Sequence, residues 1–407
     1  EHAVKIRNTA AEKDAAILVD GRSVKDGGSA KLVIKGLVDV ENDDVSVIQA
    51  NKGDVSIGGG KIIAKGDKAS SLKINNDGKI QINGNLSDRN VLTAGAVKHD
   101  VQIEGNVLAQ KGRLGLVLNT DGSYIKGLIG TDAGTAGQTY MMLSDGASWY
   151  HEGKGARTDG IKESKIKNLE ADGGNIYQKN EKPITIENYK GNMKLFYKHE
   201  NAGTKAADYK AGNTYIGSAA EGSHITVVTD RSNINTDNED QVYEVLNALA
   251  GKLYYDAYKT GEEKLTGQAT IAEGLTSSSQ TVKMKDMLFK KENGQGYVQG
   301  KPTPPPLVNP VRHQIVEANY FAEEARDFWS KAGVYDGKGH YKFDHDLSLV
   351  THAEDDPVTT VNDNKFGNIY WNGDVVGDID MTGHRLELKS ITERLPKKNP
   401  NAITVYS

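Results

Sequence analysis

One five-residue phrase occurs four times in the first quarter of the chain and constrains its fold more than any other feature. Each copy has an apolar residue, a variable residue, Val or Ile, a second variable residue and Gly: "LVIKG", "VSIGG", "IQING" and "VQIEG". The copies begin at Leu32, Val55, Ile80 and Val101, in steps of 23, 25 and 21 residues. Internal periods of this length are typical of repeat architectures, in which one structural unit stacks on the next.

The phrase itself predicts a short β-strand that ends in a turn. Apolar and polar residues alternate in it, as they do in a strand with one buried face. The outward positions hold Gln81, Asn83, Gln102 and Glu104, whereas the inward ones hold Val, Ile or Leu. Similar strands followed by Gly, Asn or Asp recur from Ala30 to about Asp230, and these residues tolerate the positive φ of sharp turns.

Two architectures fit short strands separated by turns. An antiparallel meander or sandwich shows turn signals every 8–12 residues or so. A parallel β-solenoid adds a longer period, one coil, and here two or three strands fall within each period of roughly 21–25 residues. We therefore predict an all-β chain built as a β-solenoid, with the sandwich as the alternative.

A helix-containing insertion is predicted to interrupt this pattern. Residues 1–230 form the solenoid, 231–340 an inserted helical and loop module, and 341–407 a solenoid continuation. A helix within 235–258 has an apolar stripe and a cap at Asp237 or Asn238. The stripe is made by Val242, Val245, Leu246, Leu249 and Leu253. After the proline-rich "KPTPPPLVNP", a second helix is predicted to begin near Asn309 and to end near Gly333.

Composition excludes two classes of protein and indicates a compartment. Charged residues make up 26% of the 407 residues with a net charge of −5, so no basic face for nucleic acid is expected. No apolar run approaches the ~18–20 residues of a membrane-spanning helix. Cysteine is absent, which suits a chain that crosses an oxidising compartment unfolded.

Three polar segments were considered as metal or nucleotide sites. The patch from His340 to Asp356 is rich in Asp and His, but an extended strand directs its neighbouring side chains to opposite faces. Asn233–Gln241 lacks the Gly and Glu of an EF-hand loop, and Gly130–Tyr140 has glycines but no following helix. We therefore predict no metal and no cofactor.

Catalytic signals are equally weak. A β-helix enzyme that cleaves polysaccharides needs paired acids on one face, and Asp378 and Asp380 are such a pair within one strand. The sequence cannot supply the partner acid from a neighbouring coil. We expect a protein that is not an enzyme, with a polysaccharide-active hydrolase or lyase as the alternative.

Three tyrosines were the best candidates for a contact surface. Tyr254, Tyr255 and Tyr258 follow the first predicted helix stripe, and Tyr258 lies one helical turn beyond Tyr254. Exposed Tyr is favoured in recognition because it offers large area at little entropic cost. The alternative is that these rings pack the insertion against the strands.

The repeat, its turns and the missing cysteines resemble the passenger domain of a monomeric type V autotransporter. The segment "NALAGKLYYDAYKTGEEKLTGQATIAEGLTSSS" is similar to segments of Veillonella-like surface adhesins. This resemblance implies a right-handed parallel β-helix, exported through the outer membrane and displayed on the cell surface as a monomer. It also implies that a membrane β-barrel follows the C-terminus.

From the resemblance we expect a bacterial surface adhesin. It would attach to a host-cell receptor or glycan, or to the surface of another bacterium. Recognition is expected from strand faces or from the 231–340 module. A structural stalk with no ligand of its own is a further alternative.

Overall fold

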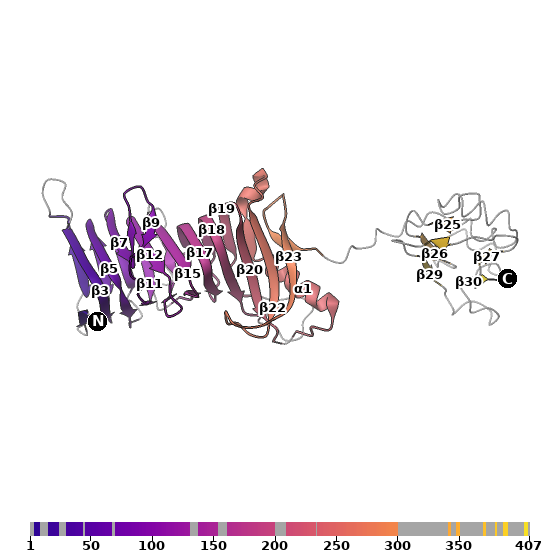
Figure 1. Cartoon of the computed structure of the whole chain (residues 1–407), viewed down its shortest axis with the longest axis horizontal. Coiled ribbons are helices and arrows are strands. Elements are labelled where there is room, and N and C mark those ends of the chain that lie inside the picture. The colour runs from indigo at the N-terminus through magenta and orange to yellow at the C-terminus, as the bar shows by residue number, and fades with distance from the viewer. Residues whose placement is uncertain are drawn as a thin grey trace. The chain divides into compact units, whose positions relative to one another are not determined.

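The structure is a computed structural model that divides into two compact units, Glu1–Gln299 and Gly300–Ser407, each described here by itself (Figure 1). In the first unit the described residues are 4–8, 15–23, 30–43, 45–66, 70–130, 137–153, 161–199, 209–232 and 234–299. In the second unit only the backbone of six strands is described. Strands account for 59% of the described structure and helices for 7%.

Twenty-four described strands and two helical segments make up the first unit. The first twelve strands are β1 (Val4–Asn8), β2 (Ile17–Asp20), β3 (Ala30–Asn42), β4 (Ile48–Asn51), β5 (Gly53–Ala64), β6 (Ser70–Asn75), β7 (Gly78–Ile82), β8 (Gly84–Leu86), β9 (Leu92–Ala94), β10 (Val101–Glu104), β11 (Asn106–Ala109) and β12 (Gly112–Leu118). The others are β13 (Tyr124–Lys126), β14 (Ile129–Gly130), β15 (Gln138–Ser144), β16 (Ser148–His151), β17 (Ser164–Gln178), β18 (Ile184–Tyr197), β19 (Thr214–Ala219), β20 (Ser223–Asp230), β21 (Leu253–Tyr255), β22 (Leu265–Ala272), β23 (Thr281–Phe289) and β24 (Gly296–Val298).

Eight of these strands pair in a closed ring. Their order is β5–β7–β12–β15–β17–β16–β13–β10, and β10 pairs with β5 again. All eight pairings are parallel. The expected right-handed parallel β-helix is therefore corrected: the strands form a closed eight-stranded parallel β-barrel with further strands added to it.

The ring closes because two long strands each pair with two shorter ones. The first half of β5 pairs with β7 and its second half with β10. In the same way β17 pairs with β15 near its middle and with β16 at its end. A repeat period in the sequence indicates which strands are equivalent. It does not show that one long strand pairs with two shorter strands, so the closed ring could not be predicted.

The four repeated phrases do not all lie in one register. Val55 lies opposite Leu32 in β3 and opposite Ile80 in β7, as steps of similar length predict. Val101, in contrast, lies opposite Gly60 in the second half of β5. The fourth phrase therefore belongs to a second row of strands beside the first.

Inward side chains of the parallel strands form one continuous core. Ile57, Ile80, Ile103 and Leu116 are buried, with exposed fractions of 2% or less. A second parallel sheet, in the order β14–β11–β6–β4–β2, closes another side of this core. The burial of so much aliphatic surface is the main stabilising contribution to such a fold.

The parallel stacking ends at an antiparallel hairpin and a helix. Strand β23 pairs antiparallel with both β22 and β24. Helix α1 (Glu239–Ala250) packs on β20, β22, β23 and β24. Of the two predicted caps, Asn238 is the one used: its Oδ1 accepts hydrogen bonds from the backbone N–H groups of Asp240 and Gln241, both at 3.1 Å.

The segment expected as an inserted module, 231–340, is divided by the structure. Its part up to Gln299 belongs to the first unit, where β21 pairs with β19 and β22 with β20. The predicted second helix, from Asn309 to Gly333, lies outside the described residues.

In the second unit the described strands form three parallel pairs. They are β25 (Tyr341–Lys342), β26 (Leu347–Val350), β27 (Ile369–Trp371), β28 (Ile379–Asp380), β29 (Leu386–Lys389) and β30 (Ile403–Val405).

Candidate functional site

The three tyrosines proposed as a contact surface lie beyond the helix and not on it. Helix α1 ends at Ala250, Tyr254 and Tyr255 belong to β21, and Tyr258 lies in the 3₁₀ helix η2 (Asp256–Thr260). Because neighbouring side chains of a strand point to opposite faces, Tyr254 and Tyr255 are separated. The predicted helical spacing of these residues is therefore wrong.

Tyr255 is a core residue. Its side chain is fully buried and its ring lies 5.5 Å from that of Phe289. Its hydroxyl donates a hydrogen bond to Glu262 Oε1 at 2.8 Å. Burial, and then this carboxylate, raise the pKa of Tyr255. A fully buried ring cannot offer contact area, so the structure corrects this part of the tyrosine hypothesis.

Tyr254 and Tyr258 are both partly buried by neighbouring rings. Tyr254 stacks on Tyr215 at 4.9 Å, and its hydroxyl accepts a hydrogen bond from Gln295 Nε2 at 3.0 Å. Tyr258 packs against the core, with its ring 5.8 Å from that of Phe289. These contacts agree with the packing alternative, and the binding role of the two residues stays a prediction.

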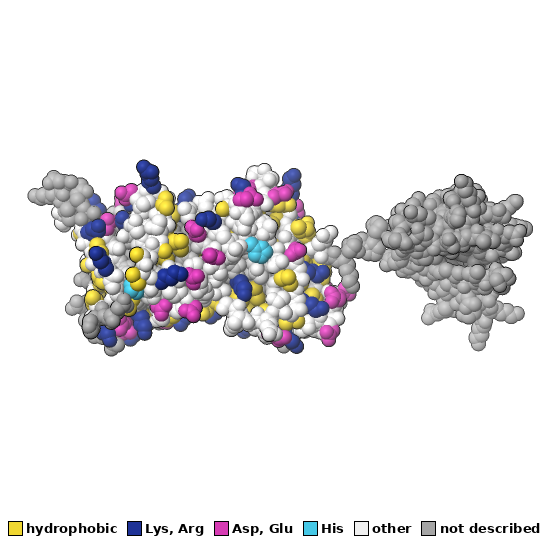
Figure 2. All heavy atoms as spheres, viewed as in Figure 1, with side chains coloured by type: hydrophobic (Ala, Val, Ile, Leu, Met, Phe, Trp, Pro, Cys, Tyr) yellow, Lys and Arg dark blue, Asp and Glu magenta, His cyan; other side chains and the backbone are white. Residues whose placement is uncertain are grey.

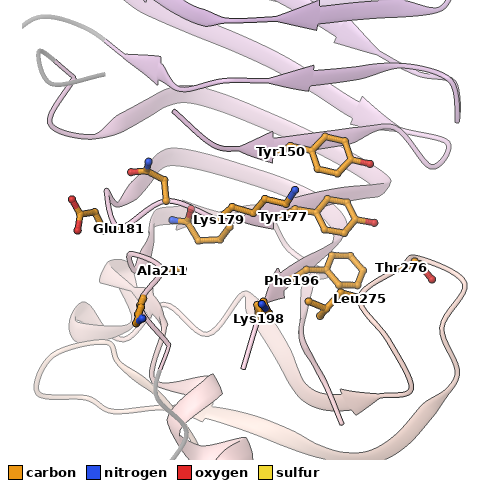
Figure 3. A pocket seen from close by; sticks show the side chains of 12 residues that line it. Tyr150, Tyr177, Lys179, Glu181, Phe196, Lys198, Ala211, Leu275 and Thr276 are labelled. Atoms are coloured by element: carbon orange, nitrogen blue, oxygen red, sulfur yellow. The ribbon is translucent and has the colours of Figure 1, made fainter. Parts of the chain in front are cut away.

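A different set of aromatic residues forms a column on the outside of the parallel strands. Tyr150 of β16 lies opposite Tyr177 of β17, and Tyr177 lies opposite Phe196 of β18. Their ring centroids are 4.7 Å and 4.5 Å apart, with interplanar angles of 13° and 10°. These distances match the ~4.8 Å spacing of paired strands, so the register alone stacks the rings (Figure 3).

An open groove of about 680 Å³ lies beside this aromatic column. Its apolar wall holds Tyr150, Tyr177, Phe196 and Leu275, and Thr276 follows at the rim. The other lining residues come from the ends of β17 and β18 and from the segment before β19, and all but Ala211 are polar: Gln178, Lys179, Asn180, Glu181, Lys198, Lys210 and Ala211. A concave site with apolar surface and a few polar groups is the usual form of a ligand site.

The groove carries more positive than negative charge. Lys179, Lys198 and Lys210 line it together with a single carboxylate, Glu181. Lys179 is partly neutralised, because its Nζ lies 3.2 Å from Glu152 and 5.0 Å from the centroid of the Tyr150 ring. Lys198 and Lys210 are exposed, and no ion pair joins either to another described residue.

Elsewhere the charges are mixed. On the face of the first unit seen in Figure 2, basic and acidic side chains are interspersed. Many belong to pairs across neighbouring strands, such as Lys190 with Glu170 at 2.8 Å and Lys126 with Glu104 at 3.2 Å. Exposed pairs of this kind contribute little to stability. These pairs do keep the positive and negative charges of the surface close to balance. The excess of lysine in the groove is therefore a local feature.

A buried histidine lies behind the groove. His151 Nδ1 is hydrogen-bonded to Gln178 Oε1, and its Nε2 lies 2.8 Å from Ser164 Oγ. Ser164 Oγ also accepts from the backbone N–H of Ile129 at 3.0 Å. Since an amide oxygen only accepts, His151 carries its proton on Nδ1, and Ser164 donates to Nε2.

This histidine is structural. Burial lowers the pKa of His151 to about 4, against a smaller opposing effect of the Gln178 hydrogen bond. His151 and Ser164 both have an exposed fraction of 0%, so no substrate reaches the hydroxyl. The pair therefore fixes the end of β16 beside the groove and does not form a nucleophile and base.

The polar segments considered earlier show no binding site in the described residues. No group of three Asp, Glu or His in the described chain is placed to hold a metal ion. In Asn235–Gln241, side-chain amides bond the local backbone and cap α1. Most of Gly130–Tyr140, the side chains of His340–Asp356, and the pair Asp378 and Asp380 lie outside the described residues. No described helix is long and apolar enough to cross a membrane.

The comparisons with known proteins give no relative. No family model matches the chain, and neither the curated proteins nor the solved structures contain a match to it. The function is therefore argued from the groove alone.

Proposed function

We propose that this chain is an extracellular bacterial adhesin that binds a host-cell or bacterial surface molecule in the groove beside the aromatic column. One observation carries the proposal: a concave site lined by apolar rings and by Lys198 and Lys210, which form no ion pair with another described residue, on a scaffold whose other described charges are mixed. A ligand gains apolar contact on one wall and polar contacts on the other. Strands β16, β17 and β18 hold the aromatic wall, so little ordering of that wall is needed on binding.

Attachment, rather than cleavage, is the activity favoured by this site. Glycosidic hydrolysis needs two carboxyl groups on either side of the bond that is broken. The groove supplies one, Glu181, and it is exposed on the rim. Proposed export to the cell surface agrees with the absence of cysteine from all 407 positions.

A narrowed groove provides the test. Glu181→Trp places a large ring in the mouth of the groove, at an exposed position whose side chain makes no hydrogen bond to another described residue. Glu221→Trp is the matched control, since it makes the same change at an exposed turn between β19 and β20. The full chain, fluorescently labelled, is measured for saturable binding to epithelial cells and to oral or gut bacteria.

We expect Glu181→Trp to reduce saturable binding at least about tenfold, the loss of about 1.4 kcal/mol of binding free energy. Glu221→Trp should bind like the original chain, and circular dichroism should show both variants folded. Equal loss in both variants, or no loss in either, contradicts a ligand site in the groove.

A further inference from the structure

We infer that the groove ligand is a saccharide that carries a carboxylate or sulfate group. This inference rests on the proposed adhesin function and adds the chemical class of the ligand. The charge of the groove, the pairing of the strands around it and the polar groups in its wall support this ligand class.

The lysines set the sign of the ligand charge. Lys179 already has Glu152 as its partner, at 3.2 Å. Lys198 and Lys210 both belong to the segment that joins β18 to β19, one near each end of it, and both line the groove without a carboxylate partner among the described residues. Two ammonium groups around one concave site attract an anion and repel a cation, and the low-dielectric aromatic wall strengthens that preference.

Strand pairing disfavours an extended acidic peptide. A peptide that adds to a sheet needs a strand edge with free N–H and C=O groups. Here β16 pairs with β13 and β17, β17 pairs with β18, and β18 pairs with β19 and β20. The strands beside the groove have no free edge, so their backbone cannot hold a peptide as an added strand. Recognition must come from side chains.

The remaining wall suits hydroxyl groups. Asn180 uses its Oδ1 to accept from the backbone N–H of Lys182 at 2.9 Å, which orients the amide and leaves its NH₂ as a donor. Glu181 is an acceptor. The hydroxyl of Thr276 lies 2.7 Å from Ser279 Oγ, a contact within its own turn. A sugar presents several hydroxyls that donate and accept, together with C–H surface that can lie against Leu275 and the ring edges (Figure 3).

The size of the groove agrees with a short saccharide. Its volume of about 680 Å³ lies within the range of roughly 300–1,000 Å³ that is typical of small-ligand sites. The open side leaves room for the rest of a chain to continue into solvent. We therefore expect a terminal or internal acidic unit to occupy the groove.

The test compares lactose with two derivatives of it that carry an acidic group. Sialyllactose and 3′-sulfolactose represent the carboxylate and sulfate sources, lactose is the neutral reference, and poly-glutamate is the acidic peptide. Binding of the full chain is measured by calorimetry or biolayer interferometry at two salt concentrations. We expect at least a roughly tenfold preference for an acidic glycan over lactose, weakened at high salt because ionic screening shortens the range of charge interactions.

Charge reversal identifies the groove as the source of this preference. The double variant Lys198→Glu and Lys210→Glu should lose the preference, and Lys198→Arg with Lys210→Arg should retain it. Lys31→Glu with Lys35→Glu is the matched control, because both residues are exposed on β3, away from the groove, and the change in net charge is the same.

The outcomes separate this inference from the proposed function. Equal binding of sialyllactose, 3′-sulfolactose and lactose, blocked by Glu181→Trp, overturns the anionic preference and leaves a groove-binding adhesin. Binding of poly-glutamate without any glycan also overturns it, in favour of an acidic protein ligand. Cell binding that Glu181→Trp leaves intact rejects the groove, and with it both proposals.

Discussion

The inner and outer faces of the same three strands differ in what their side chains do. Trp149, Ile176 and Leu195 face inward, and each has an exposed fraction of 0%. One position along, Tyr150 and Tyr177 stack on the outer face, and Phe196, which continues the stack, is only 2% exposed because Val228 and Ala272 pack against it. Because the strands pair in parallel register, Trp149, Ile176 and Leu195 form an inner row, and Tyr150, Tyr177 and Phe196 form an outer row. The inner row stabilises the fold, whereas the residue types in the outer row can vary.

The outer row does vary along its length. Before Tyr150, the same register position holds Lys126 of β13 and Glu104 of β10, which form an ion pair. From Tyr150 to Phe196 it holds rings, and the groove lies beside them; after Phe196 it holds Val228 of β20. The strand pairing continues unchanged from β13 to β18 while the outward residues change from charged to aromatic. The candidate site therefore arises from a change of side chains and not from a change of backbone.

The largest expected effect on stability comes from the inner row. Trp149→Ala removes a fully buried ring whose Nε1 donates to the carbonyl of Gly127 at 2.9 Å. Loss of burial and the cavity left behind should lower the free energy of unfolding by about 3–5 kcal/mol. Urea unfolding followed by circular dichroism measures the change. Tyr150→Ala, at the next position of the same strand, is the comparison. If Trp149→Ala lowered the free energy of unfolding less than Tyr150→Ala does, the division into inner and outer rows would be contradicted.

The next effect depends on pH and tests the buried His151, which lies on the same face of β16 as Trp149. Burial lowers the pKa of His151 to about 4 from its ordinary value of 6.5. Between these values the unfolded chain binds a proton at this site and the folded chain does not. The free energy of unfolding should therefore fall as pH decreases from about 6.5 to about 4, by about 3 kcal/mol in total.

His151→Gln is the control for this pH dependence. Gln keeps a polar group beside Ser164 but does not titrate, so stability should depend less on pH in this window. Some dependence should remain, because burial also lowers the pKa of His224. Protonation of Asp20, whose pKa is about 2 beside Arg22, acts at lower pH. Identical pH profiles for the two chains would show that His151 does not titrate as proposed.

Parallel strands and the first helix could be predicted from the sequence because both depend on local periodicity. The equivalence of Leu32, Val55 and Ile80 follows from steps of similar length. The stripe of Val242, Leu246 and Leu249 identifies α1 in the same way. The closed ring could not be predicted because it depends on β5 and β17, each of which pairs with two different strands along its length. These pairings join residues that are far apart in the sequence, and a local residue pattern does not indicate them.

The groove could not be predicted from the sequence for a similar reason. Tyr150, Tyr177 and Phe196 stand at unequal steps of 27 and 19 residues, and turns of different length hide their common register. One signal was available: "SWYH", "NIYQ" and "KLFY" each pair an inward apolar residue with an outward ring. Tyr254, Tyr255 and Tyr258 are more conspicuous because they are close together in the sequence, but β21 places Tyr254 and Tyr255 on opposite faces and Tyr258 lies in η2.

A smaller effect is expected from the outer row. Tyr177 stacks on Tyr150 at 4.7 Å and on Phe196 at 4.5 Å. Tyr177→Leu keeps an apolar side chain but removes two aromatic pairs, each worth about 0.5–1.5 kcal/mol. We expect the free energy of unfolding to fall by about 1–3 kcal/mol, measured by urea unfolding. Tyr177→Phe, which keeps both stacks, should stay close to the original chain, and an equal loss in the two variants would contradict a role for stacking.

The smallest effect on stability should come from the groove lysines. Lys198 and Lys210 are exposed and form no ion pair with another described residue. Reversal of both charges should therefore change the free energy of unfolding by no more than about 0.5 kcal/mol for each substitution. The same double variant is expected to lose its preference for acidic glycans. A large loss of stability would show that these lysines stabilise the fold and would contradict a role in recognition alone. A stable double variant with altered glycan binding would show that the lysines act in binding and not in folding.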